Sequence, residues 1–236
     1  MRKVRPQDVK SDFISQVDAS LEHYQRVIIS LSSTPNEKLD ISIMSQTLFH
    51  SVFVDFECFL SDLFLAYLNS DFSQYQATFE SSVRASVSDK HSPWFSGKIS
   101  FNVPRHMKID DIAEAVDPTG WNMTFKSCDV MKTQARKWLA TAHRNRICNL
   151  ANDDIAIIDT ARAIRNCIAH QSTGSVSIMN QMLSSVEVGH ARNLNLGRGT
   201  KNVTSVGAFL KARHAGIPRV VRYAERLKDA AQSLTI

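Results

Sequence analysis

Residues 48–68 read LFHSVFVDFECFLSDLFLAYL and form the most apolar stretch of the chain. This stretch is long enough to cross a bilayer. It is interrupted by a histidine and three acidic residues, namely His50, Asp55, Glu57 and Asp62. Because ionisable groups are costly inside a membrane, we expect a buried helix rather than a membrane span. The run is apolar on nearly all sides, so a helix over about 41–69 should lie at the centre of the fold.

Further helices are predicted on both sides of this central one, because apolar residues recur there at spacings of three and four. Their ranges are about 7–32, 126–143, 152–169, 175–186 and 218–233. Asn152 or Asp153 can cap the third of the five, and Pro218 suits the first turn of the last. With only 8 Gly and 6 Pro in 236 residues, long helices are favoured over a sheet fold.

The segment 70–125 reads as an insertion between core helices, with mixed structure around 70–120. Its expected elements are a helix over 71–87, a loop over 88–98, an extended segment or short strand over 98–103, and a short helix over 108–121. A basic, glycine-containing stretch near 188–203 suggests an exposed loop or hairpin, and TPNEKLD (34–40) suggests a turn. We therefore predict one all-α domain over 1–236, a helical bundle with core helices over 7–69 and 126–186.

The charge and cysteine content constrain partners and location only coarsely. A net charge of +5 and a pI of about 9.1 permit a polyanionic partner, but a merely basic surface explains them equally well. The four cysteines, Cys58, Cys128, Cys148 and Cys167, form no C-x-x-C pair. Neither a zinc site nor a disulfide framework is expected. Together with an N-terminus unlike a signal peptide, this predicts a reducing, cytoplasmic setting.

The segment ARAIRNCIAHQSTG (161–174) places polar residues at the end of an apolar helical run. Arginine precedes histidine at similar spacing in Arg84…His91 and Arg136…His143, so spacing alone carries little weight. Only in the third pair, Arg165 and His170, does asparagine directly follow the arginine. Asn166 and His170 lie four residues apart on one helical face, so the amide can bond the imidazole or nearby backbone. Arg165 lies about 100° away and should point toward an adjacent groove.

These residue types suit cleavage of RNA by its own 2′-hydroxyl. An imidazole with a pKa near 6.5 can act as the base, and a guanidinium can bind the phosphate on which charge develops. No metal or other cofactor is required. One copy of His170 leaves the 5′-oxygen without an acid, so a two-fold dimer that brings Arg165 and His170 from both chains into one cleft is expected.

The motif RNCIAH (165–170) resembles the Arg-Asn-x-x-x-His signature of HEPN domains, and its RN-x-I-A-H form is most like the RiboL-PSP branch. The acid within the long apolar helix, Glu57 in VDFECFL, adds to the resemblance. It implies an all-helical, dimeric, metal-independent endoribonuclease, often a toxin or antiviral effector, with Arg165 and His170 catalytic and Asn166 supporting them. A related toxin group has tyrosine where this chain has Ser172, so regulation by an antitoxin that modifies that tyrosine is not expected.

Two basic stretches are candidates for RNA contact. Arg136 and His143, seven residues apart, should share a helical face, which Lys137, Arg144 and Arg146 extend. Either an RNA-backbone track or a solvated face explains these charges. A loop carrying Arg192, Arg198 and Lys201 can meet phosphates or be plain surface. Trp94, Phe95 and Trp121 are expected to cover the core rather than to stack on bases.

Other interpretations stay open. His170 could simply complement a helix C-terminus, and Glu57 could be a structural acid paired with a core arginine or could orient Arg165. The chain could be a catalytically inactive HEPN module that binds nucleotide, RNA or protein. It could also be a helical interaction domain in which RNCIAH is accidental. Expected partners are RNA, a second copy of the chain and a regulatory or antitoxin protein.

Overall fold

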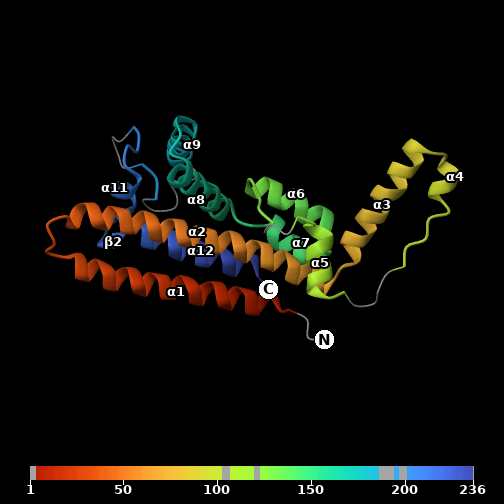
Figure 1. Cartoon of the computed structure of the whole chain (residues 1–236), viewed down its shortest axis with the longest axis horizontal. Coiled ribbons are helices and arrows are strands. Elements are labelled where there is room, and N and C mark those ends of the chain that lie inside the picture. Colours follow the sequence, from red (N-terminus) through yellow and green to blue (C-terminus); the bar gives the residue numbers. More distant parts are fainter. Residues whose placement is uncertain (1–3, 103–106, 120–122, 186–193, 197–200, 236) are drawn as a thin grey trace. The chain divides into compact units, whose positions relative to one another are not determined.

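The computed structural model describes residues 4–102, 107–119, 123–185, 194–196 and 201–235. Within these ranges the chain is all-α, as predicted, with 11 helices and a single two-stranded sheet (Figure 1). The described residues form two compact units. Unit 1 takes its residues from Met1–Val9 and Leu60–Asn149, and unit 2 takes them from Lys10–Phe59 and Leu150–Thr235.

The two long N-terminal helices confirm the predicted central helix and the one before it. Helix α1 spans Pro6–Leu31 and α2 spans Glu37–Ser70. The turn predicted over 34–40 is therefore wrong for its last four residues. Glu37 and Asp40 lie in the first turn of α2, where a carboxylate interacts favourably with the helix dipole.

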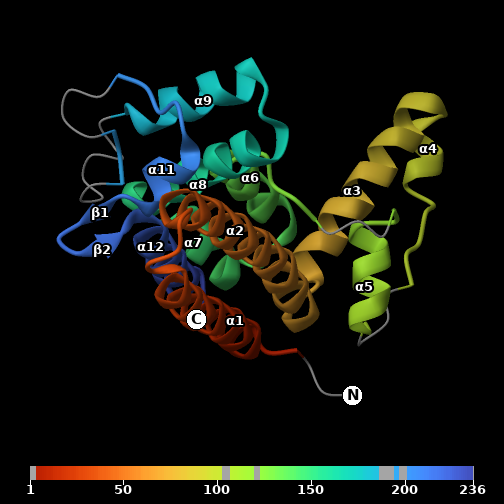
Figure 2. The same ribbon diagram turned by 60° about the vertical axis from the view of Figure 1, so that its left-hand side comes forward.

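Aromatic rings form much of the core of unit 2. Phe13 of α1 stacks on Phe59 of α2 with ring centroids 5.0 Å apart and meets Phe56 edge-on at 5.6 Å. Further along α2, Phe49 packs against Tyr223 at 5.3 Å. Tyr223 belongs to α12 (Arg219–Leu234), which runs beside α1 and α2 in Figures 1 and 2.

Helix α8 (Asn152–His170) carries the RNCIAH motif, and α9 (Thr173–Leu183) follows it directly. Both confirm predicted helices. The predicted cap is wrong, because Ala151 occupies the N-cap position of α8 without a side-chain hydrogen bond. At α12, Pro218 is likewise the N-cap rather than a first-turn residue.

A short helix and a hairpin between α9 and α12 were not predicted. Helix α11 spans Val206–Lys211, and strands β1 (Arg213–His214) and β2 (Ile217–Pro218) pair antiparallel. Ala215 and Gly216 join the strands with φ angles of 46° and 80°, the conformation that a two-residue hairpin turn requires. In the predicted basic loop, the described residues Leu194 and Val203 are buried rather than exposed.

Unit 1 contains the predicted insertion together with two helices that follow it. These are α3 (Ser73–Lys90), α4 (Pro93–Ser96), α5 (Ile109–Val116), α6 (Cys128–Trp138) and α7 (Thr141–Cys148). Helix α4 lies in the predicted loop, and residues 98–102 form no strand. The single helix predicted over 126–143 is wrong, because the backbone is extended at Leu139. The Leu139 side chain is fully buried, so tertiary packing rather than proline or glycine ends α6.

Within the described ranges, every helix is too short or too polar to span a membrane.

Candidate functional site

The predicted catalytic residues lie in unit 2, where α8 packs near α2. The Arg165 guanidinium forms an ion pair with Glu57 of α2 through Nη2 and Oε2, joining residues 108 positions apart in sequence. Through Nη1 it also donates a hydrogen bond to Asn166 Oδ1 at 2.9 Å. Three of the four residues singled out by sequence are therefore in direct contact.

This cluster is only partly open to solvent. The Arg165 side chain is 25% exposed and that of Glu57 is 13% exposed. Arg165 Nε is buried without a hydrogen-bond partner. An arginine has five N–H groups, so each terminal nitrogen retains one N–H beyond those given to Glu57 and Asn166. Glu57 and Asn166 thus fix the guanidinium in place, while its remaining N–H groups can still contact an anion.

His170 is the last residue of α8 and is exposed. The helix ends there because Gln171 adopts a left-handed conformation with φ of 48°, and its N–H bonds to the Cys167 carbonyl at 3.0 Å. Ser172 then caps α9 by accepting a hydrogen bond from the Ser175 N–H at 3.2 Å. The His170 imidazole makes no hydrogen bond or ion pair with any described residue, so it is free to meet a ligand or a second chain.

The role predicted for Asn166 needs correction. We expected its amide to bond the His170 imidazole or nearby backbone, but its oxygen accepts from Arg165. The neighbouring guanidinium is a charged donor, and hydrogen bonds from charged donors are stronger than those from neutral ones. Asn166 therefore orients the arginine.

A second arginine on α8 was missed by the sequence analysis. Arg162 is 8% exposed overall, pairs with Asp159 at 2.7 Å, and lies over the Phe53 ring at 5.8 Å. Its Nε is buried without a partner. The available signal was an Asp–Arg pair three residues apart on a helix face that is otherwise apolar. Phe53 and Glu57 of α2 thus each meet one arginine of α8.

The first stretch of RNA-binding candidates lies in unit 1, on two helices rather than one. Arg136 lies in the last turn of α6 and is exposed, whereas the half-buried Arg144 on α7 donates to Thr141 Oγ1 at 3.2 Å. Arg146 on α7 is exposed. The shared helical face predicted for Arg136 and His143 is wrong because the helix breaks between them. His143 instead stacks on Tyr67 with centroids 4.4 Å apart, and burial lowers its pKa.

The remaining candidates are placed only in part. Lys201 is exposed, while Arg192, Arg198 and Trp121 lie outside the described residues. Trp94 and Phe95 were expected to cover the core, and that prediction is wrong: their exposed fractions are 63% and 53%.

Among the residues that the structure describes, no three His, Cys, Asp or Glu side chains gather as metal ligands would. No family model, curated protein or solved structure matches this chain.

Proposed function

We propose that this protein is a HEPN-type endoribonuclease that cleaves RNA without a metal ion, at a site shared by two copies of the chain. The observation that supports this best is the Arg165–Glu57–Asn166 cluster on the helix that ends in the exposed His170. An oriented guanidinium and an accessible imidazole are the two groups that the reaction needs.

In the proposed reaction, one His170 imidazole takes the proton from a ribose 2′-hydroxyl. The 2′-oxygen then bonds to the adjacent phosphorus while the bond from phosphorus to the 5′-oxygen breaks. The second copy of His170, in its protonated form, donates a proton to that leaving oxygen. The products are a 2′,3′-cyclic phosphate and a free 5′-hydroxyl. Arg165 stabilises the negative charge on the phosphate oxygens in the transition state.

Glu57 and Asn166 act through Arg165 in this scheme. Their two hydrogen bonds fix the plane of the guanidinium, so less side-chain entropy is lost when it binds a phosphate. Arg136, Arg144, Arg146 and Lys201 are proposed to contact the RNA backbone, since each is a described basic residue from the candidate stretches.

The biological role that accompanies this activity is that of a cytoplasmic toxin or antiviral defence effector. A regulatory or antitoxin protein would then hold the nuclease inactive. Ser172 stands where related toxins have a modified tyrosine, so such a protein would act by binding rather than by modifying that position.

A second candidate function is a catalytically inactive HEPN module that binds nucleotide, RNA or protein. The pairing of Arg165 with Glu57 favours this second function, because a mostly buried ion pair can have a purely structural role. The two functions differ in whether RNA is cut.

The test is cleavage of mixed cellular RNA by the purified protein in EDTA. We expect cutting with cyclic-phosphate ends, and loss of at least about a hundredfold in rate in His170→Ala and Arg165→Ala. The matched controls are His23→Ala and Arg26→Ala, which change exposed residues on α1 outside the cluster. Full activity in His170→Ala would reject the catalytic role, whereas RNA binding without cutting by the wild type would favour the second candidate.

A further inference from the structure

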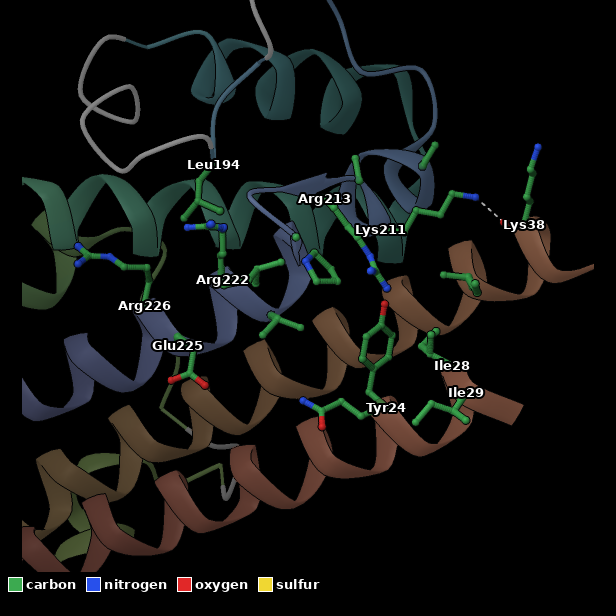
Figure 3. Close-up of a pocket in the computed structure, with 18 of the residues that line it drawn as sticks. Tyr24, Ile28, Ile29, Lys38, Leu194, Lys211, Arg213, Arg222, Glu225 and Arg226 are labelled. Atoms are coloured by element: carbon green, nitrogen blue, oxygen red, sulfur yellow. Dashed lines mark hydrogen bonds between the residues drawn. The ribbon is translucent and has the colours of Figure 1, made fainter. Parts of the chain in front are cut away.

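A large pocket opens in unit 2 with a lining that does not include the Arg165 cluster (Figure 3). Its volume is about 1330 Å³, above the range of about 300–1,000 Å³ that is common for small-molecule sites. Residues of α1, α2, α11, the β1–β2 hairpin and α12 line it. The pocket can therefore hold a bulky or extended molecule.

One part of the lining is aliphatic. It is made by Ile28, Ile29, Ile41, Leu194, Ile217 and Val221. Ile29 and Ile217 are 72% and 44% exposed, so apolar surface remains for a ligand to cover. Tyr24 is the single aromatic residue among the described lining residues, and it is 4% exposed with its hydroxyl bonded to Ser45 at 2.8 Å. It offers no open ring face, so this surface suits an aliphatic body better than a stacked base.

The described lining carries five basic and three acidic side chains. Some of these charges are already engaged. Arg226 bonds to Asp154 at 2.9 Å, and Glu225 is paired with Lys228, neither partner being part of the lining. Without Arg226 and Glu225, four basic and two acidic side chains remain in the described lining.

The other basic side chains of the described lining are Lys38, Lys211, Arg213 and Arg222, and the other acidic ones are Glu37 and Asp153. The Arg213 guanidinium makes no hydrogen bond or ion pair with the described residues, and Figure 3 shows it reaching toward Tyr24. Arg222 gives one hydrogen bond to a main-chain acceptor, the His214 carbonyl, at 2.9 Å, and its Nε is buried without a partner. Figure 3 shows the two guanidiniums apart, that of Arg213 beside Tyr24 and that of Arg222 on the Leu194 side. Each is therefore a separate place for a carboxylate or phosphate, which arginine binds through paired hydrogen bonds.

We propose that this pocket binds an amphipathic organic anion, with an aliphatic body against the isoleucines and a carboxylate or phosphate group at one of the two arginines, Arg213 or Arg222. The isoleucines can bury the apolar part of such a ligand, and the arginines can bind its charged group. The proposal does not depend on ribonuclease activity.

The test is calorimetric titration of the full chain with dodecyl phosphate, dodecanoate and dodecyltrimethylammonium, each below its micelle-forming concentration. The three probes share one alkyl chain and differ in head group. We expect both anions to bind and the cation to bind roughly tenfold more weakly or not at all. The stronger anion identifies the preferred head group, and equal binding of all three would overturn the proposal.

Two variants and a control test the arginines directly. The variants are Arg213→Ala, which alters an exposed hairpin residue, and Arg222→Gln; the variant of the arginine that holds the head group should bind dodecyl phosphate about tenfold more weakly. Arg26→Ala removes an exposed arginine outside the lining and should leave binding unchanged. Circular dichroism checks that each variant is folded. Wild-type affinity in both folded pocket variants, or binding to anionic phospholipid vesicles without binding of the free anion, would overturn the proposal.

Discussion

In the pair of Arg165 and Glu57, each charge is stabilised by the opposite charge of its partner. Removing the carboxylate leaves a guanidinium that is only 25% exposed without its counter-charge. We expect Glu57→Gln to lower the free energy of unfolding by about 1–3 kcal/mol, less than for a fully buried pair because solvent still reaches the site. Urea denaturation followed by circular dichroism measures this change.

The matched control is Glu22→Gln, which removes an exposed ion pair with Arg26 on α1. Exposed pairs contribute about 0–1 kcal/mol, so this variant should remain close to the wild type. Equal stability of the Glu57 and Glu22 variants would contradict a supporting role for Glu57.

Asp55 gives α2 a pH-dependent contribution to stability. Burial raises the pKa of its carboxyl above the ordinary value. The folded protein therefore holds this proton to a higher pH than the unfolded chain does, and the free energy of unfolding falls as the pH rises through that interval. We expect Asp55→Asn to be more stable than the wild type at pH 7, with the difference disappearing below the unfolded pKa of about 3.9.

Thermal unfolding of Asp55→Asn and wild type at several pH values measures this effect. The control is Asp12→Asn on α1, where the side chain is exposed and little change is expected. A variant that is less stable than the wild type at pH 7 would show that the Asp55 charge is stabilising.

At the scale of elements, helix α11 packs on α2 through a glycine. A Cβ placed on Gly207 would lie 2.6 Å from the Ser42 carbonyl oxygen and 2.5 Å from Gln46 Nε2. The glutamine side chain can move, but the carbonyl belongs to the backbone of α2 and cannot shift without bending the helix. We expect Gly207→Ala to lower the free energy of unfolding by about 1–3 kcal/mol, as overpacking does.

Gly174→Ala on α9 is the control for this substitution. A Cβ there would have no neighbour within 4 Å, so alanine should be neutral or should stabilise the helix by up to about 1 kcal/mol. Denaturant unfolding of both variants gives the comparison. A Gly207 variant as stable as the Gly174 variant would show that α11 can move away from α2.

Helices were predicted correctly where their own apolar spacing identifies them. Helices α1, α8 and α12 carry apolar residues at helical spacing, and all three were predicted. The break after α6 was not, because Leu139 has no unusual local preference and its burial depends on distant residues. Helix α11 is only six residues long, which is too short for a periodic pattern to identify.

At the scale of the whole molecule, a site that needs His170 from two chains predicts a specific response to mixing. If both copies are required, equal amounts of wild type and His170→Ala, allowed to exchange subunits, should retain about a quarter of the activity of the same total amount of wild type. Independent active chains would retain about half. Cleavage rates of the mixtures distinguish the two outcomes, with His23→Ala in place of His170→Ala as the control.

The sequence by itself determined the helical class and the candidate residues of the site. Helical periodicity and the RNCIAH motif are local properties, since side chains three and four positions apart meet on one helix. From them, Arg165, Asn166, His170 and Glu57 could all be selected as candidates, although Glu57 was not assigned a definite partner.

Only the tertiary structure decided which of these residues touch. It paired Arg165 with Glu57 and Asn166, left His170 exposed, and brought Arg213 and Arg222 to a pocket with aliphatic residues of α1 and α2. Such contacts join residues far apart in the chain, as Glu57 and Arg165 are at a separation of 108. They depend on how whole helix faces pack, which no local pattern of residues encodes.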